Sequence, residues 1–283
     1  MSNPGAAPPA AKQRSANQRG ANQGRANLDN NLRLARPKVA VDTVVFAVEK
    51  GRLKTYLVEL RGPVELRGAL KFRGEPARRG AVEHRGAVKP GSPAGAGRQP
   101  GKWAFPGGLV RVGELLDDAA RRELEASTGL RGAYLEQLFT FGDPSRDPRE
   151  HVVSVAYMAL ISSSGAVDST SPKYARGDWF EVAHLPPLAY DHSLMAAYAF
   201  KRLKSKLEYT NIAYALLPEV FTFAELEELY ATILERPLDR RNFRRRILAM
   251  GLLTRLPATR RGAHRPAALY RFARQSLQFI EML

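Results

Sequence analysis

The stretch that decides the fold runs from Gly107 to Leu130 and reads GGLVRVGELLDDAARRELEASTGL. Small and aliphatic residues recur in it every four positions, at Leu116, Ala120 and Leu124. This spacing predicts a helix over 114–128 with one buried face. Gly129 follows that helix, at the position where a glycine with a positive φ commonly ends one.

An amphipathic helix with a glycine cap leaves the polar residues of this stretch unexplained. The segment resembles the Nudix box, whose pattern is G-x5-E-x7-R-E-U-x-E-E-x-G-U, with U aliphatic. The residues that match are Gly108, Glu114, Arg122, Glu123, Leu124, Gly129 and Leu130. The resemblance implies an α/β Nudix-fold sandwich, in which helices flank a mixed sheet.

Two glutamates of that pattern are missing, because Ala126 and Ser127 stand in their place. In Nudix hydrolases such carboxylates hold Mg²⁺, which bridges a diphosphate and helps to place the attacking water. Alanine cannot ligate a metal, and a serine hydroxyl is a weak neutral ligand. Glu123 lies one turn before Ser127 and could hold one metal weakly, so weak Mg²⁺ binding stays open. We expect a diphosphate-binding fold with crippled or absent hydrolysis, no catalytic residues and no required cofactor.

The composition limits the class of protein. The chain has 283 residues, a formal net charge of +16 and no cysteine, and its pI is about 10.3. So basic a balance favours phosphate-bearing partners. The lack of cysteine excludes disulfides and cysteine-ligated metals and favours a reducing cytoplasm. No apolar run is long enough for a membrane helix, no secretory signal is recognisable, and the five histidines show no metal-site spacing.

Composition also divides the chain. Residues 1–36 contain no aromatic residue and are predicted to be a disordered basic tail. Residues 63–100 repeat Arg-Gly-Ala and are rich in Gly, Pro and Arg, which predicts a flexible insertion. We predict a Nudix-like domain over 37–190, a connecting helix over 191–210 and a second domain over 211–283.

Several patterns place strands in the first domain. The stretch VAVDTVVFAVEKGRLKTYLVELRG predicts two strands around a turn at Lys50-Gly51. The stretch HVVSVAYMALISS is almost continuously apolar, as is typical of a strand covered on both faces. The stretch KWAFPGGLV predicts a strand that enters a Pro-Gly-Gly turn. Alternating strands and helices predict an α/β sandwich.

The C-terminal domain has a different pattern. Thr222 and Glu225 have the spacing of a capping box, and a second helix is expected between Asp239 and Gly251. The stretches LLTRL and AALYRF then flank a polar turn. Two helices followed by a β-hairpin predict a winged helix-turn-helix domain.

A second resemblance covers roughly residues 39–275, outside the 63–100 loop. The stretches LFTFGDPSRDPREHVVSVAYMAL, LDRRNFRRRIL and RPAALYRF are similar to those of Nudix-related transcriptional regulators of the NrtR type. The resemblance implies that the Nudix-like domain binds ADP-ribose or a related NAD-derived nucleotide. It implies a homodimer whose winged helices bind a palindromic operator until the ligand weakens binding. The regulated genes would serve NAD synthesis or salvage, although some members govern sugar use.

Candidate DNA contacts lie on the second helix and the wing: Arg241, Asn242, Arg244, Arg245, Arg260, Arg261 and Arg265. Arginine forks can reach guanine edges or phosphates, and Asn242 could read adenine or cap its own helix. A run of arginines can equally be a solvated helix face. The sequence does not separate base contacts from phosphate contacts.

Candidate effector contacts are Gly107, Gly108, Arg146, Arg149 and Phe105. The glycines would let a diphosphate approach the backbone, and the arginines could clamp phosphates or form surface ion pairs. Phe105 or Phe141 could stack on adenine or belong to the core, and a structural role is favoured for His192.

Two other functions compete with the ligand-responsive repressor. One is a working Nudix hydrolase, an ADP-ribose pyrophosphatase with an accessory basic domain. The other is a constitutive DNA-binding protein in which the Nudix-like domain serves only for dimerisation.

Overall fold

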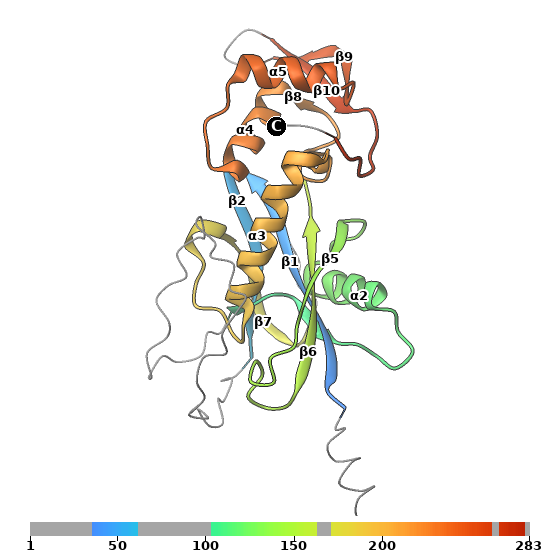
Figure 1. Ribbon diagram of the computed structural model, residues 1–283, viewed down its shortest axis with the longest axis vertical. Helices are drawn as coiled ribbons and strands as arrows, with labels where there is room; N and C mark the ends of the chain where they lie inside the picture. The colour runs from blue at the N-terminus through green and yellow to red at the C-terminus, as the bar shows by residue number, and fades with distance from the viewer. Residues whose placement is uncertain (1–35, 62–102, 163–170, 262–265, 281–283) are drawn as a thin grey trace, which may run out of the picture. The chain divides into compact units, whose positions relative to one another are not determined.

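The computed structural model describes residues 36–61, 103–162, 171–261 and 266–280. The predicted tail, apart from Arg36, and the predicted 63–100 loop lie outside the described residues, as does Arg265. The described part contains a large sheet with its helices and a smaller domain of helices and short strands (Figure 1).

Within the described residues, the large sheet has seven strands in the order β3-β2-β1-β6-β5, with β4 paired to β1 and β7 paired to β2. The strands are β1 (Lys38–Glu49), β2 (Arg52–Leu60), β3 (Trp103–Ala104), β4 (Gly107–Leu109), β5 (Tyr134–Phe141), β6 (Val152–Leu160) and β7 (Tyr174–Glu181). β1 runs parallel to β6, and the other pairs are antiparallel. The predicted mixed sheet is confirmed.

The first hairpin has the predicted turn. Lys50 and Gly51 adopt φ values of 51° and 68° between the paired residues Glu49 and Arg52. Two consecutive positive φ angles give a two-residue turn whose twist matches that of the flanking strands. Gly51 lowers the steric cost of this conformation, and Lys50 bears the rest of it.

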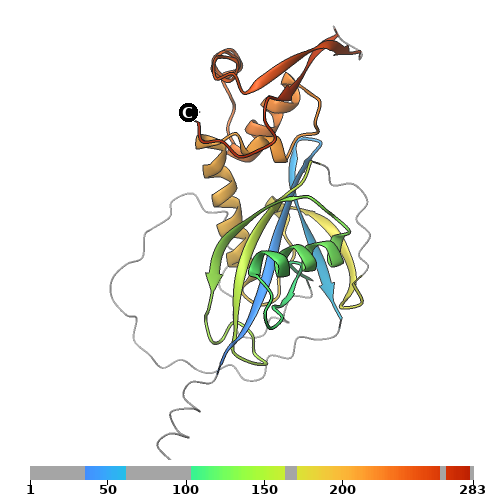
Figure 2. The ribbon, with the colours of Figure 1, turned by 90° about the vertical axis from the view of Figure 1, so that its right-hand side faces the viewer.

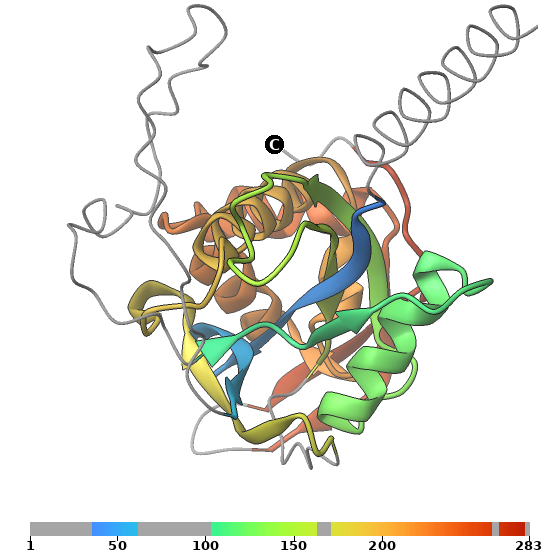
Figure 3. The ribbon, with the colours of Figure 1, turned by 90° about the horizontal axis from the view of Figure 1, so that it is seen from below.

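Strand β6 is covered on both faces, as its apolar sequence predicts. Alternate residues Ala156, Met158 and Leu160 join the core that contains the helix α3 (His192–Tyr209). The side chains of the other alternation, such as Val155 and Tyr157, join the core on the side of α2 (Leu116–Thr128). The two helices therefore cover opposite faces of the sheet (Figures 2 and 3).

Helix α2 ends where the sequence predicts. Gly129 has a φ of 70°, and its N–H donates to the Glu125 carbonyl at 2.7 Å. Ala120 and Leu124 are buried in the cores against the sheet. The Nudix box therefore presents its apolar stripe to the sheet and places Arg122 and Glu123 beside β4.

The C-terminal domain contains α4 (Phe223–Leu234), α5 (Arg240–Ala249) and a sheet in the order β8-β10-β9. Its strands are β8 (Phe221–Thr222), β9 (Leu253–Arg260) and β10 (Ala267–Phe272). The capping box of Thr222 and Glu225 is present, and Asp239 accepts a hydrogen bond from the Asn242 N–H at 3.1 Å. The predicted winged helix is confirmed, with β8 as a strand that the sequence pattern did not indicate.

The sequence prediction was wrong about the glycine pair. Gly107 and Gly108 lie in β4, where they pair with Asp42 and Val41 of β1, and do not form a turn. A short strand with two glycines gives no apolar alternation, so periodicity alone could not detect it.

Candidate nucleotide pocket and nucleic-acid interface

A pocket of about 400 Å³ opens at one edge of the sheet. Its lining comes from β1, β4, the segment after β5, the start of β7 and the start of α3. The polar and aromatic residues of this lining are Asp42, Arg146, Asp147, Arg149, Glu150, Lys173, Tyr174, Tyr190, His192 and Phe105. The volume lies in the range typical of small-molecule sites.

Arg146 is a buried residue of the pocket wall that is paired with carboxylates. Its side chain is 4% exposed, and its Nε and Nη2 atoms bond to the Asp191 carboxylate at 3.0 and 2.7 Å. Its Nη2 atom lies 3.7 Å from Asp42 Oδ2. Burial opposes the charged guanidinium, but the hydrogen bond to Asp191 together with the negative charges of Asp42, Asp191 and Asp147 outweighs it and raises the pKa of Arg146. Its fork is therefore already occupied by protein carboxylates.

His192 fixes the start of α3 against the pocket. Its Nδ1 atom accepts a hydrogen bond from the Phe105 N–H at 2.9 Å, and its ring stacks on the Phe105 ring. Burial lowers the pKa of His192, which agrees with a neutral ring that accepts at Nδ1. Phe105 is 1% exposed and belongs to the core, so the structure favours the core role for this residue.

Arg149 is the more accessible of the two predicted arginines. Its side chain is 60% exposed, and its guanidinium bonds to the Asp147 carboxylate and to the Tyr190 hydroxyl at 2.9 Å. Burial disfavours a charged Asp147, but the hydrogen bonds from Arg149 together with the positive charges of Arg149 and Arg146 outweigh this effect and lower the pKa of Asp147. Tyr190 has a φ of 52°, a strained value for a bulky residue, and residues held in this way are common at binding sites.

The two glycines leave room for protein groups. A Cβ on Gly107 would lie 2.2 Å from Asp42 Oδ1, and a Cβ on Gly108 would lie 2.4 Å from Glu123 Oε1. The Tyr174 hydroxyl accepts from the Gly107 N–H at 3.1 Å and donates to the Gly107 carbonyl at 2.8 Å. Burial raises the pKa of Tyr174 to about 12. Any larger residue at 107 or 108 would displace these groups.

The residual Nudix box forms a closed network of ion pairs. Arg122 donates to Glu114 through Nε at 2.6 Å and through Nη2 at 2.8 Å, and its Nη1 atom pairs with Glu123. The hydrogen bond from Arg122, helped by that from the Arg111 N–H, lowers the pKa of Glu114 to about 2. Lys173 Nζ lies 2.8 and 2.6 Å from the two oxygens of Glu123.

This donor set does not fit the divalent cation that a Nudix hydrolase uses. Glu114 and Glu123, the two box carboxylates, are each bonded to cationic side chains, and Ala126 and Ser127 replace the other acids. Among the residues that the structure describes, no cluster of three or more His, Cys, Asp or Glu side chains could hold a metal ion.

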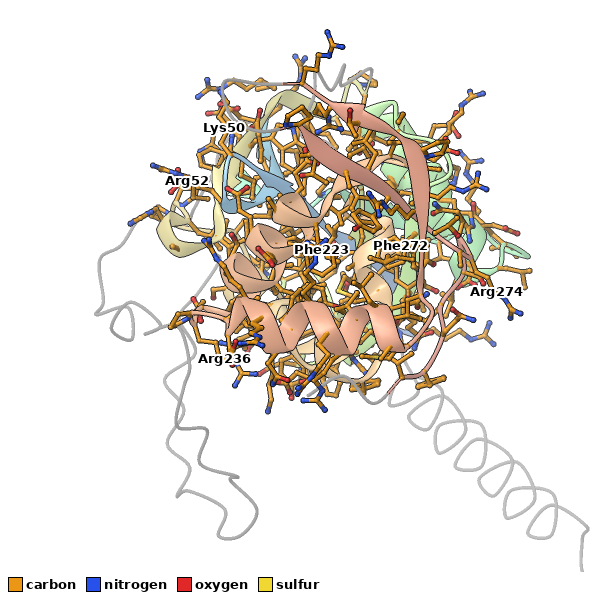
Figure 4. All side chains as sticks on the ribbon, turned by 90° about the horizontal axis from the view of Figure 1, so that it is seen from above. Lys50, Arg52, Phe223, Arg236, Phe272 and Arg274 are labelled. Atoms are coloured by element: carbon orange, nitrogen blue, oxygen red, sulfur yellow. The ribbon has the colours of Figure 1, made fainter. Side chains whose placement is uncertain are left out.

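Helix α5 presents a strongly basic outer face. It carries five arginines and no acid in ten residues, while Phe243 and Ile247 are buried beneath it. In Figure 4, Phe223 and Phe272 lie inside the domain, whereas Arg236 and Arg274 lie at its periphery. An exposed basic helix above an apolar core has the geometry of a groove-reading helix.

The predicted DNA contacts of α5 differ in how strongly the domain holds them. Arg244 lies over the Phe223 ring at 4.5 Å and donates to the Tyr270 hydroxyl at 3.0 Å. Arg245 donates to the Asn242 side-chain oxygen at 2.8 Å. Arg241 is exposed, and no ion pair of its guanidinium is seen with the described part of the chain.

The wing is held to the first helix of its domain. Arg260 donates to Glu225 Oε1 at 2.7 Å and to the Val220 carbonyl at 3.2 Å. Arg261 is exposed at the last described position before the tip of the wing. Arg260 thus ties the wing to the capping box, whereas Arg261 extends beyond it.

The sequence prediction missed several polar residues of the pocket lining, among them Lys173, Tyr174 and Tyr190. The sequence carries only a weak signal for Tyr190, because a positive φ at a tyrosine cannot be inferred from the residue type. Only the pairing of β7 with β2 brings Lys173 beside Gly108 and Tyr174 beside Gly107. In the described residues, the structure shows no helix with the length and hydropathy required to span a membrane.

The comparisons with known proteins agree with this architecture. The NUDIX domain model matches residues 91–200, and the NrtR DNA-binding winged helix domain model matches residues 213–272. The crystal structure of Shewanella oneidensis NrtR complexed with a 27mer DNA matches with a TM-score of 0.61 and 28% identity. That match covers 83% of this chain and 93% of the Shewanella chain.

Two curated proteins are similar in sequence. The ADP-ribose pyrophosphatase of Methanocaldococcus jannaschii is 35% identical over 92 residues, which are 32% of this chain and 53% of that protein. The ADPR responsive transcriptional repressor NtrR of Acinetobacter baylyi is 37% identical over 185 residues, which are 64% of this chain and 74% of that protein. Because the match to the repressor covers 74% of that protein, and because both a NUDIX domain model and an NrtR winged helix model match this chain, it belongs to the NrtR family of Nudix-related transcriptional regulators.

Proposed function

We propose that this chain is a transcriptional repressor that responds to ADP-ribose or a related NAD-derived nucleotide. Its Nudix-like domain (37–190) binds the nucleotide, and its winged helix domain (211–283) binds operator DNA. One observation carries the proposal: a pocket edged by cations, whose described residues include no metal-binding donor set, shares a chain with an arginine-rich helix. Such a pocket can recognise a diphosphate without cleaving it.

The nucleotide contacts follow from the lining of the pocket. Arg149 and Lys173 present partly exposed cations to a bound diphosphate. Tyr190 offers an aromatic face at the same edge, already in contact with the Arg149 guanidinium 5.6 Å from its ring centre. Arg146 positions Asp191 and Asp42 beneath them. The glycines keep the β4 backbone close to this floor.

The DNA contacts are assigned to α5 and the wing. Arg241 and Arg245 are the best placed to reach a groove, with Asn242 held between helix turns by Arg245. Arg244 positions α5 against Phe223 and Tyr270, and Arg260 positions the wing. Arg261 extends the basic surface toward the backbone of the duplex, where it would contact a phosphate. Arg265 lies outside the described residues and stays a proposed DNA contact on the sequence alone.

The pocket and the DNA-binding domain are linked through α3 and the first hairpin. Asp191 and His192 anchor the start of α3 in the pocket, and the buried Lys206 near its end pairs with Glu136 of β5. The Thr232 hydroxyl of α4 donates to the Gly51 carbonyl at 3.2 Å. A ligand that moves Asp191 would therefore bias α3, and in a homodimer this would change the spacing of the two recognition helices.

The biological setting is part of the same proposal. The repressor acts in the cytoplasm, where it meets both the genome and the nucleotide pool. A nucleotide derived from NAD is a fitting signal for genes of NAD synthesis or salvage. Sugar-use genes are the competing target.

The proposal is tested by fluorescence anisotropy. A duplex selected from random DNA by the full chain serves as the operator, and ADP-ribose is added at increasing concentration. ADP-ribose should raise the dissociation constant for DNA, and DNA should weaken ADP-ribose binding by the same factor. Unchanged DNA affinity at saturating ADP-ribose would contradict the response and favour a constitutive DNA-binding protein.

The hydrolase is the second candidate, because part of the chain is similar to an ADP-ribose pyrophosphatase. AMP release from ADP-ribose in Mg²⁺ or Mn²⁺ is measured by chromatography with that enzyme as the positive control. We expect no turnover by this chain. Rapid metal-dependent cleavage would replace the repressor proposal with the enzyme.

A further inference from the structure

We infer that the Lys173 ammonium takes the place of the divalent cation in this pocket, so that the pocket holds a diphosphate without metal. The inference rests on the proposed function, because it specifies how the proposed effector is bound. The chain keeps the Nudix fold, but Ala126 and Ser127 replace two of the carboxylates that would hold a metal.

The contact geometry is that of a cation on a carboxylate. Lys173 Nζ lies 2.8 Å from Glu123 Oε1 and 2.6 Å from Glu123 Oε2. The Glu123 side chain is 2% exposed, whereas the Lys173 side chain is 50% exposed. The carboxylate is therefore fixed in the protein, and the ammonium lies on its solvent side.

The lysine also borders the nucleotide pocket. Lys173 belongs to the lining, and its Nζ atom would lie 2.7 Å from a Cβ at Gly108. An ammonium has three donors, and two suffice for the two oxygens of Glu123. The third donor remains for an anion in the pocket, where a metal would have carried the same attraction.

The charges in the box are balanced without a metal. Arg122 and Lys173 supply two positive charges against the two negative charges of Glu114 and Glu123. A divalent cation that approached the Glu123 carboxylate would be repelled by the Lys173 ammonium, which already pairs with it. Carboxylates that are free to coordinate are what Mg²⁺ requires, and Glu123 is not free.

Lys173 differs from Arg122, the other cation on Glu123. Both fork edges of Arg122 are used: Nε and Nη2 bind Glu114, and Nη1 binds Glu123. Its side chain is 25% exposed, half the value for Lys173. Lys173 is thus the cation that can face a ligand and Glu123 at once.

The first experiment titrates the full chain with Mn²⁺ and measures free metal by electron paramagnetic resonance. Wild type should show no site tighter than about 1 mM. Lys173→Met removes the ammonium, leaves Glu123 paired with Arg122, and should bind Mn²⁺ more tightly than wild type. Adding Glu123→Gln to that variant should remove the gain. Equal Mn²⁺ binding by wild type and Lys173→Met would overturn the inference.

The second experiment titrates ADP-ribose by calorimetry in EDTA and in Mg²⁺. Wild-type affinity should be the same in both, and Lys173→Met should bind roughly 10- to 100-fold more weakly in EDTA, the usual effect of a charged hydrogen bond. Lys54→Met is the matched control, because Lys54 pairs with Glu49 outside the pocket. Wild-type binding that needs Mg²⁺, or an unaffected Lys173→Met, would refute the role of Lys173.

The two experiments separate the two proposals. If wild type binds no ADP-ribose in either buffer, the proposed effector is wrong, while the Mn²⁺ titration still decides whether Lys173 excludes the metal. Thermal unfolding of each variant confirms that the comparison is between folded proteins.

Discussion

Replacing Arg146 with methionine should destabilise the Nudix-like domain strongly. The substitution removes a guanidinium that is 4% exposed and leaves the carboxylates of Asp191 and Asp42, which are 14% and 12% exposed. Breaking a buried ion pair by removing one partner costs about 3–5 kcal/mol, because the remaining charge is desolvated and unpaired. Slight exposure of both carboxylates favours the lower end, about 3 kcal/mol.

Urea unfolding followed by tryptophan fluorescence measures this loss. The chain has two tryptophans, Trp103 in β3 and Trp179 in β7, so the signal reports the large sheet. Arg131→Met is the control, because Arg131 pairs with Glu125 at the surface, with side chains 82% and 44% exposed. Its loss should cost less than about 1 kcal/mol.

A double-mutant cycle isolates the cause. Asp191→Asn removes one of the stranded charges, so the Arg146→Met/Asp191→Asn protein should recover about 1–3 kcal/mol relative to additive losses. If Arg146→Met lowers the free energy of unfolding no more than Arg131→Met, or if the cycle shows no coupling, the Arg146–Asp191 pair does not stabilise the domain. That result would favour a phosphate clamp as the role of Arg146.

Three other substitutions test separate parts of the structure. Arg241→Ala should weaken operator binding and reduce the slope of log affinity against log salt by about 1 if it contacts a phosphate; Arg176→Ala on β7 is the control, and an unchanged slope and affinity would remove Arg241 from the interface. Glu114→Gln should make the free energy of unfolding depend less on pH at acid pH, since the pKa of Glu114 in the folded protein, about 2, lies below its ordinary value of 4.5. The stability that this carboxylate gives the wild type is complete above pH 4.5 and is lost as the pH falls toward 2. If the urea midpoint changes equally in wild type and variant between about pH 5 and about pH 3, the pairing of Glu114 with Arg122 is contradicted. Thr222→Ala should cost about 1 kcal/mol by breaking the capping box, whereas Thr222→Ser should retain stability, as measured by thermal unfolding.

Much of the fold could be predicted because local signals agreed with tertiary ones. The turn at Lys50-Gly51, the αL glycine at Gly129 and the capping box at Thr222 each rest on backbone chemistry that a few residues determine. The continuous apolar run of β6 predicted its burial on both faces, because a strand with one face in water would alternate apolar and polar residues. These features depend little on what the rest of the chain does.

The candidate site was less predictable because its partners are distant in sequence. Glu123 and Lys173 are fifty positions apart, and Arg146 and Asp191 are forty-five apart. A sequence shows that Arg146 can form a fork, but only the fold shows that Asp191 already fills it. The same holds on α5. The sequence makes Arg244 and Arg241 look equivalent, but in the fold the Arg244 guanidinium lies over the Phe223 ring.

Strand β1 limits how the length of this protein can change during descent. It pairs with β2, β4 and β6, and its side chains alternate between two covered faces, with Val44 and Phe46 on one and Val41 on the other. Deleting a single residue inside it would turn every later side chain to the opposite face. Insertions and deletions accepted among related repressors should therefore gather in the connecting loops and be absent from 38–49.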